Sequence, residues 1–185
     1  SDESLKHIAV WLSSDIPDKK KTPQGLYLSA KAAYDELQDL GEETLFIDVR
    51  TRAELAFVGA PTNIDANIPY MKLDGYADWD EKKNNFKMYP NSEFTMLVED
   101  LVKKRNLNKD TPIILICRSG SRSARSAKLL HQAGYNNVYS VVDGFEGDKA
   151  KEGPHKGVRV VNGWKNSGLP WSYKLEKQAM YWELN

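Results

Sequence analysis

Short apolar runs alternate along the chain with segments whose apolar residues recur at helical spacing. Residues 44–49 and 138–142 are rich in β-branched and aromatic side chains, which favours strands. Residues 112–116 form a continuous apolar run typical of a central parallel strand. Residues 64–69 form a weaker extended segment that ends at a proline. We therefore predict three buried strands and one shorter extended segment.

Three other segments follow a helical period. The first begins after Ser29, a favourable N-cap residue, and ends at Gly41. The second covers residues 92–104, and the third covers residues 122–133, with Gly134 as its end. Alternation of strands and helices favours a parallel sheet with helices on both faces, so we predict an α/β fold.

The remaining segments lack this periodicity. We expect residues 1–25 to form an arm packed on the domain, with the lysine run at residues 19–21 as a solvated face. Residues 26–185 are expected to form a single domain that includes a long surface excursion at residues 70–91 and an aromatic C-terminal extension. The tryptophans are expected to be core or packing residues: Trp79, Trp164, Trp171 and Trp182.

Charge and composition argue against several functions. Lys+Arg and Asp+Glu each number 26, so the formal net charge is zero, whereas nucleic-acid binders normally show a basic excess. The longest apolar stretch is far too short to cross a membrane. His7, His131, His155 and the single cysteine do not have metal-ligand spacing. We therefore expect no nucleic acid, membrane, metal or cofactor as a partner.

The candidate chemistry lies in the loop after the central strand. Cys117 ends that strand and is followed by small residues, a glycine and two arginines before the next helix. In parallel sheets, ligands gather beyond the carboxyl ends of the strands. A short turn into a helix directs backbone N–H groups inward, and the helix start adds positive charge. We therefore expect Cys117 to favour the thiolate form beside a site that holds anions.

At this point the sequence resembles the rhodanese-like family. The loop Cys117-Arg118-Ser119-Gly120-Ser121-Arg122 looks like the six-residue active-site loop of that family. Four further segments are similar to family motifs and come in the right order between Tyr27 and Pro170: Phe46 to Arg50 with Glu54, Asn67-Ile68-Pro69, Ala133 to Tyr139 with Asp143-Gly144-Phe145, and Gly163 to Pro170.

The resemblance implies a three-layer fold with a mostly parallel five-stranded sheet. It implies a sulfurtransferase in which Cys117 takes a sulfur atom from thiosulfate or a related anion and passes the persulfide sulfur to a thiol or to cyanide. Asp48 and Arg50 are implied as a supporting buried ion pair. Binding of the donor is assigned to the loop residues Arg118, Ser119, Gly120, Ser121, Arg122 and Ser123. For Arg125, a solvent-exposed position and a place in the site are equally expected. The two long extensions look like those of exported bacterial relatives, which favours a periplasmic location over a cytoplasmic one.

Three other interpretations stay open. A single cysteine after an apolar strand is often only a small buried hydrophobe. Rhodanese-like domains also serve as non-catalytic binding or regulatory modules, although these commonly lack the cysteine. Phosphatases and arsenate reductases share the fold, but their loops place arginine six positions after cysteine. Here that position is Ser123, and Arg122 comes one residue earlier.

Overall fold

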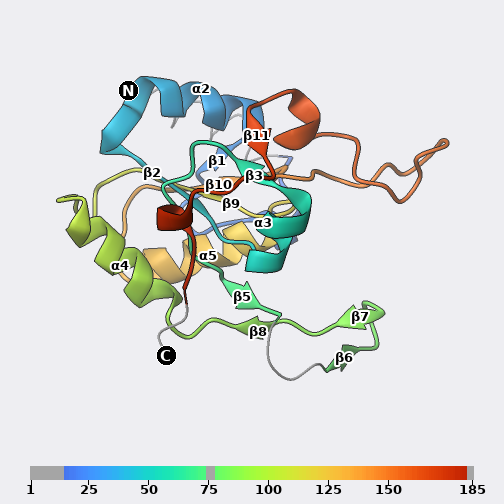
Figure 1. Cartoon of the computed structure of the whole chain (residues 1–185), viewed down its shortest axis with the longest axis horizontal. Helices are drawn as coiled ribbons and strands as arrows, with labels where there is room; N and C mark the ends of the chain where they lie inside the picture. Colours follow the sequence, from blue (N-terminus) through green and yellow to red (C-terminus); the bar gives the residue numbers. More distant parts are fainter. Residues whose placement is uncertain (1–14, 74–77, 183–185) are drawn as a thin grey trace.

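The computed structural model describes residues 15–73 and 78–182 and is built around a five-stranded sheet (Figure 1). All neighbouring strands of this sheet are parallel, in the order β1-β10-β9-β2-β4. The strands are β1 (Tyr27–Leu28), β2 (Leu45–Asp48), β4 (Ala66–Asn67), β9 (Ile113–Ile116) and β10 (Val138–Val141). The predicted α/β fold is confirmed, and the segment at 64–69 contributes the short edge strand β4.

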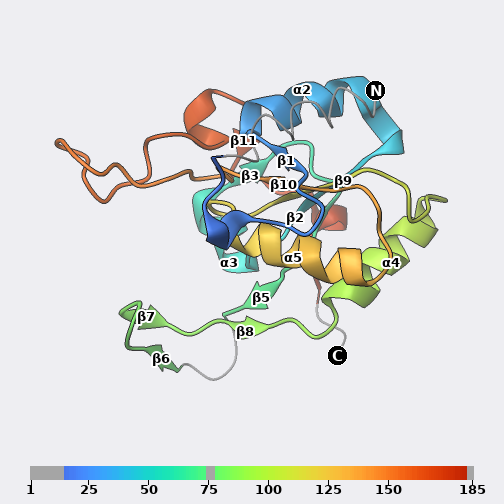
Figure 2. The same ribbon diagram turned by 180° about the vertical axis from the view of Figure 1, so that it is seen from behind.

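Helices cover both faces of the sheet. Helix α2 (Ala30–Leu40) lies on one face, and α4 (Phe94–Lys104) and α5 (Ser121–Gln132) lie on the other, as Figures 1 and 2 show. Side chains alternate across each strand, so Leu45 and Ile47 pack with α4 and α5, whereas Phe46 packs with α2. The sheet therefore separates two apolar cores.

Local sequence signals explain where the helices begin. The Ser29 side chain accepts a hydrogen bond from the Ala32 amide, as predicted for an N-cap. Helix α3 (Arg52–Val58) begins with a capping box in which Thr51 and Glu54 bond each other's backbone amides. This short helix follows β2 directly and brings Glu54 to the carboxyl edge of the sheet.

The described segments outside the sheet form three small antiparallel strand pairs and short 3₁₀ turns. Residues 71–73 and 78–90 project from the body and carry two of these pairs (Figure 1). The pairs are β3 (Ala60–Pro61) with β11 (Trp171–Ser172), β5 (Met71–Lys72) with β8 (Tyr89–Pro90), and β6 (Trp79–Asp80) with β7 (Asn85–Phe86). The 3₁₀ turns are η1 (Asp18–Lys20), η2 (Gly41–Glu43), η3 (Lys165–Ser167) and η4 (Lys177–Ala179).

Two expectations about side-chain burial need correction. Trp164 is fully buried as predicted, and Trp79, although 42% exposed, packs edge-to-face against Phe86, whereas Trp182 is 61% exposed. Within the lysine run, Lys20 is only 5% exposed, because its ammonium group reaches the Val142 carbonyl and the Asp148 carboxylate. Residues 1–14 of the predicted arm lie outside the described residues.

Candidate active site around Cys117

Cys117 is buried immediately after β9, where the backbone turns into α5. Its Sγ atom accepts a hydrogen bond from the Gly120 amide at 3.1 Å and lies 3.4 Å from the Ser123 hydroxyl. The Ser123 hydroxyl also lies 2.7 Å from that of Ser140 on β10. The sulfur therefore lies at the centre of a turn whose polar groups face it.

A second segment, residues 143–147, fixes the backbone of this loop. The Phe145 amide donates to the Cys117 carbonyl at 2.8 Å, and the Glu146 amide donates to the Arg118 carbonyl at 3.0 Å. At Gly144 the contact is so close that a Cβ atom would lie 2.5 Å from the Arg118 carbonyl. The two segments pack backbone to backbone, so the loop conformation depends on both.

These contacts use the carbonyl groups of the loop and leave its amides available. Across the described chain, the Gly120 amide donates to sulfur, but no hydrogen bond is donated by the amides of residues 118, 119, 121, 122 and 123. Successive N–H groups of this kind, at the start of a helix, form a site that attracts anions. These unbonded amides are the groups that the predicted cradle requires, and anion binding by them stays a prediction.

Arg122 has a different environment from the one predicted. Its two terminal nitrogens donate to the two carboxylate oxygens of Glu54 at 2.6 and 2.8 Å. We predicted that this guanidinium binds a substrate anion, but in the structure its anionic partner is the Glu54 carboxylate on α3. Arg122 is only 8% exposed, so the pair holds the start of α5 against α3.

The ionisation of this pair follows from its surroundings. Burial by itself would raise the pKa of Glu54, but the hydrogen bonds and charge of Arg122, with smaller effects of Arg50 and the Thr51 amide, lower that pKa to about 2. Burial would lower the pKa of Arg122, whereas Glu54, and to a smaller extent Cys117, raise it. Both groups are therefore charged at neutral pH, and the positive charge stays beside the sulfur.

Asp48 and Arg50 form the buried ion pair that was predicted. Arg50 Nη2 lies 2.6 Å from Asp48 Oδ2, and both side chains are fully buried. Asn67 on β4 donates to the backbone carbonyls of both residues, and the Arg50 guanidinium lies 4.1 Å from the centre of the Phe145 ring. The pair thus connects β2 and β4 to the segment that supports the Cys117 loop.

The other loop residues line the outer side of the site. Arg118 is exposed, and Arg125 is exposed with one guanidinium nitrogen 3.3 Å from the Ser121 hydroxyl. Arg159, which lies outside the recognised motifs and was not predicted, lines the same groove as Ser119 of the loop. The pKa of Arg159 is lowered by burial first and then by the charge of Arg118, with a smaller effect of Arg122.

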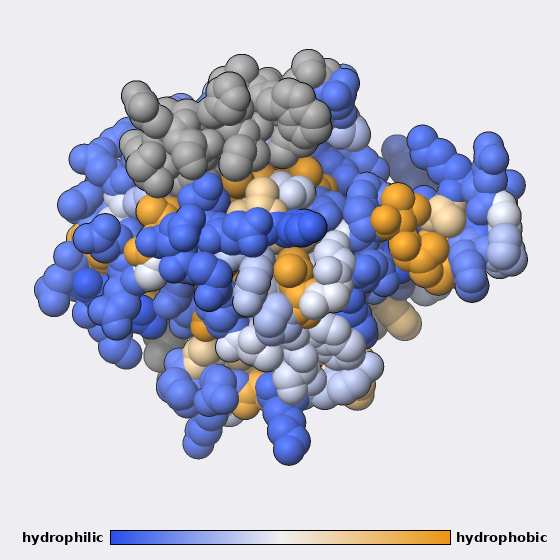
Figure 3. Space-filling model, turned by 90° about the horizontal axis from the view of Figure 1, so that it is seen from above, coloured by the Kyte–Doolittle hydropathy of each residue, from blue (hydrophilic) through white to orange (hydrophobic). Residues whose placement is uncertain are grey.

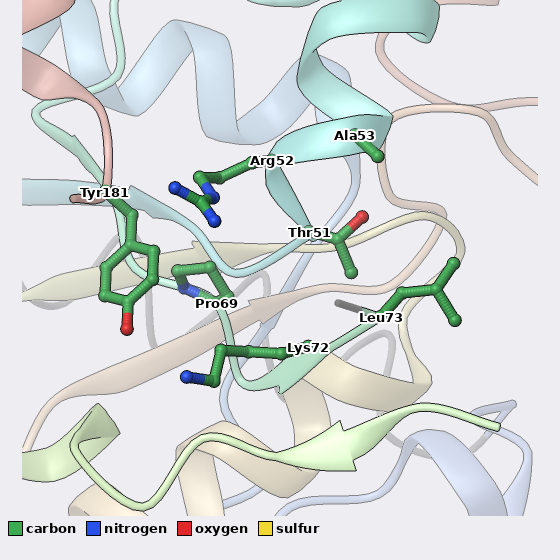
Figure 4. Close-up of a pocket in the computed structure, with 7 residues that line it drawn as sticks. All are labelled: Thr51, Arg52, Ala53, Pro69, Lys72, Leu73 and Tyr181. Carbon is green, nitrogen blue, oxygen red and sulfur yellow. The ribbon is translucent and has the colours of Figure 1, made fainter. Parts of the chain in front are cut away.

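A pocket of about 220 Å³ opens at the same edge of the sheet (Figure 4). Its walls come from the first residues of α3, from Pro69 after β4, and from the C-terminal segment. Figure 4 shows the Arg52, Lys72 and Tyr181 side chains around its opening.

Among residues 15–73 and 78–182, no cluster of His, Cys, Asp or Glu has the arrangement of a metal site. None of the helices in these ranges is long and apolar enough to cross a membrane.

Comparisons with known proteins agree with this architecture. Residues 29–151 match the model of the rhodanese-like domain, and the chain belongs to this family. An uncharacterized protein of Rickettsia conorii is 30% identical over 141 residues, which are 76% of this chain and 92% of that protein. The crystal structure of Rv0390 from M. tuberculosis has a TM-score of 0.58 and 29% identity, and the match covers 80% of this chain and 97% of that one.

A shorter sequence match is to a protein whose name states an enzymatic activity. Thiosulfate sulfurtransferase GlpE of Actinobacillus succinogenes is 38% identical over 61 residues, which are 33% of this chain and 40% of that protein.

Proposed function

We propose that this protein is a sulfurtransferase that carries a sulfur atom as a persulfide on Cys117. In the first step the Cys117 thiolate attacks the outer sulfur of thiosulfate or a similar anion. The sulfur–sulfur bond of the donor breaks, and its electron pair leaves with sulfite. In the second step an acceptor thiolate or cyanide attacks the outer persulfide sulfur, and Cys117 regains its thiolate. The two displacements replace one difficult transfer with two easier ones.

The observation that carries this proposal is the position of Sγ among unused loop amides. The amides of residues 118, 119 and 121–123 are available to bind the negative charge of the donor and then of the persulfide. Arg118 is exposed and can contact the departing sulfite group, whereas Arg122 contributes a fixed charge held by Glu54. Arg118 is therefore a donor-binding residue, and Arg122 is a positioning residue.

Cys117 is only 1% exposed, which favours a donor with a slender reactive end. The terminal sulfur of thiosulfate projects from its sulfonate, whereas the phosphorus of a phosphate ester is surrounded by oxygens. Sulfur transfer is accordingly the better fit to this loop. Similarity to the Actinobacillus enzyme over 61 residues supports the same donor class.

Intact mass spectrometry tests the proposal directly. After incubation with thiosulfate, the folded protein is expected to gain the mass of one sulfur atom, and cyanide is expected to remove it as thiocyanate. Cys117→Ser, which keeps the size of the side chain, is expected to remain folded and gain no mass. An unchanged mass in the wild type, or hydrolysis of p-nitrophenyl phosphate instead, would refute the assignment.

A further inference from the structure

A large groove begins at Ser119 in the Cys117 loop and has a strongly basic lining. Its volume is about 1120 Å³, and its walls come from η1 and from residues 148–161. The groove contains six cationic side chains: Lys19, Lys20, Lys149, Lys151, Lys156 and Arg159. Only two carboxylates, Asp148 and Glu152, lie among them, which gives a net charge of four positive. The whole chain has a formal net charge of zero, so this concentration of charge is local.

The groove has an inner wall held by hydrogen bonds and an exposed charged rim. Lys20 is buried and bonded to Asp148, which also accepts from Asn162, and Arg159 donates to the Gly147 carbonyl at 2.7 Å. The other four lysines are exposed. Residues 148–162 form the projecting segment seen at the right of Figure 1, and Figure 3 shows hydrophilic residues together with an apolar patch on this side. The exposed apolar residues of the segment are Val158, Val160 and Val161. The inner contacts fix this segment beside the loop, and the outer lysines face solvent.

We infer that this groove binds an acidic segment of a protein that exchanges sulfur with Cys117. The inference rests on the proposed function and names the class of partner. Thiosulfate is far too small to need such a volume, which lies above the range of about 300–1,000 Å³ that is usual for small-ligand pockets. Exposed lysines around an open groove suit the charge complementarity that guides protein association.

The chemistry of the lining favours a protein over a nucleic acid. Proteins that bind single-stranded nucleic acids add aromatic side chains on which bases stack. No aromatic side chain is among the residues that line this groove in the described chain. The short apolar contributions come instead from Pro17, Ala150 and Val161, which suit the side chains of a peptide.

The partner's thiol would take part in the second displacement. With the acidic segment in the groove, the partner's thiolate attacks the outer sulfur of the Cys117 persulfide, after losing its proton to solvent. The bond between that sulfur and Sγ breaks, its electron pair returns to Cys117, and the partner leaves as a persulfide. No oxidant or reductant is needed, because the outer persulfide sulfur only moves from the Cys117 sulfur to the partner's cysteine sulfur.

Two short synthetic peptides of equal length provide the probe. Each contains one cysteine, flanked in one peptide by aspartate and glutamate and in the other by serine and glutamine. The full chain is first loaded with thiosulfate, and loss of the sulfur atom from Cys117 is followed by mass spectrometry. At low salt we expect transfer to the acidic peptide to be about tenfold faster, and we expect high salt to remove this preference.

Charge reversal locates the effect. The triple variant Lys149→Glu, Lys151→Glu, Lys156→Glu is expected to lose the preference for the acidic peptide. The control variant Lys31→Glu, Lys104→Glu, Lys128→Glu changes three exposed lysines outside the groove and is expected to keep it. Thermal unfolding checks that each variant folds.

A binding measurement separates the two proposals. A fluorescent acidic peptide without cysteine is titrated into the unloaded protein, where sulfur chemistry plays no part. If binding occurs and Cys117 never takes sulfur, the proposed activity fails while the groove assignment stands. Equal rates for the two peptides, equal behaviour of the two triple variants, or tighter binding of a single-stranded RNA would overturn the inference.

Discussion

Replacing Glu54 by glutamine is expected to destabilise the protein because it leaves the Arg122 guanidinium without a negative partner. Glutamine keeps the shape of the side chain and can still form the capping box with Thr51, so the substitution removes mainly the charge. The Glu54 side chain is 19% exposed and that of Arg122 is 9% exposed. Loss of one member of a mostly buried pair is costly, since the remaining charge is poorly solvated.

The size of the effect follows from the pKa of Glu54. Its pKa of about 2, against an ordinary value of 4.5, corresponds to about 3 kcal/mol at neutral pH, since each unit is worth about 1.4 kcal/mol. A carboxyl group whose pKa is lowered by folding stabilises the protein above its unfolded pKa. That stabilisation disappears as the pH falls through the folded pKa. The free-energy difference between wild type and variant should therefore shrink by about half at pH 3.

Urea unfolding, followed by tryptophan fluorescence with the buried Trp164 as one contributor, measures these differences at pH 7 and pH 3. Glu99→Gln is the matched control, because Glu99 pairs with Lys109 at a site where both side chains are more than a third exposed. That substitution is expected to cost less than about 1 kcal/mol. Equal costs for the two variants at pH 7, or a Glu54→Gln cost that does not change with pH, would contradict the reasoning.

Two further predictions concern the Cys117 loop. Gly144→Ala should lower both stability and sulfur uptake, because its Cβ would lie 2.5 Å from the Arg118 carbonyl. Gly153→Ala, also at a positive φ but with no atom within 4 Å, should show only the smaller cost of backbone strain. Ser123→Ala removes the hydroxyl 3.4 Å from Sγ, which accepts from the Cys117 thiol and can donate to the sulfur once the thiol has lost its proton. The substitution should slow sulfur uptake about tenfold, as expected for loss of a hydrogen bond to a charged group. Sulfur uptake by all three variants is measured by quenching the reaction at set times and recording the intact mass. A wild-type rate in Gly144→Ala or in Ser123→Ala would refute the role assigned to that residue's contact.

Sequence information was sufficient for the features that depend on neighbouring residues. Apolar periodicity located β2, β9, β10 and the three longer helices, because burial of one face imposes a repeat on the residues that form it. The N-cap at Ser29 was also predicted, since its partner lies three residues away, and the family resemblance implied the buried pair of Asp48 and Arg50. The ordered motifs around Cys117 identified the family.

The tertiary structure decided which distant groups complete the site. Glu54 and Arg122 are 68 positions apart, and no local pattern indicates that one neutralises the other. The amides of residues 145 and 146 hold the loop carbonyls across a similarly non-local contact. Lys20 and Arg159 lie close to the loop but come from segments without hydrophobic periodicity. From the sequence, Lys20 was therefore predicted to face solvent, and Arg159 received no prediction. Contacts of this kind depend on how the chain folds back on itself, and such long-range pairing leaves no repeat in the sequence.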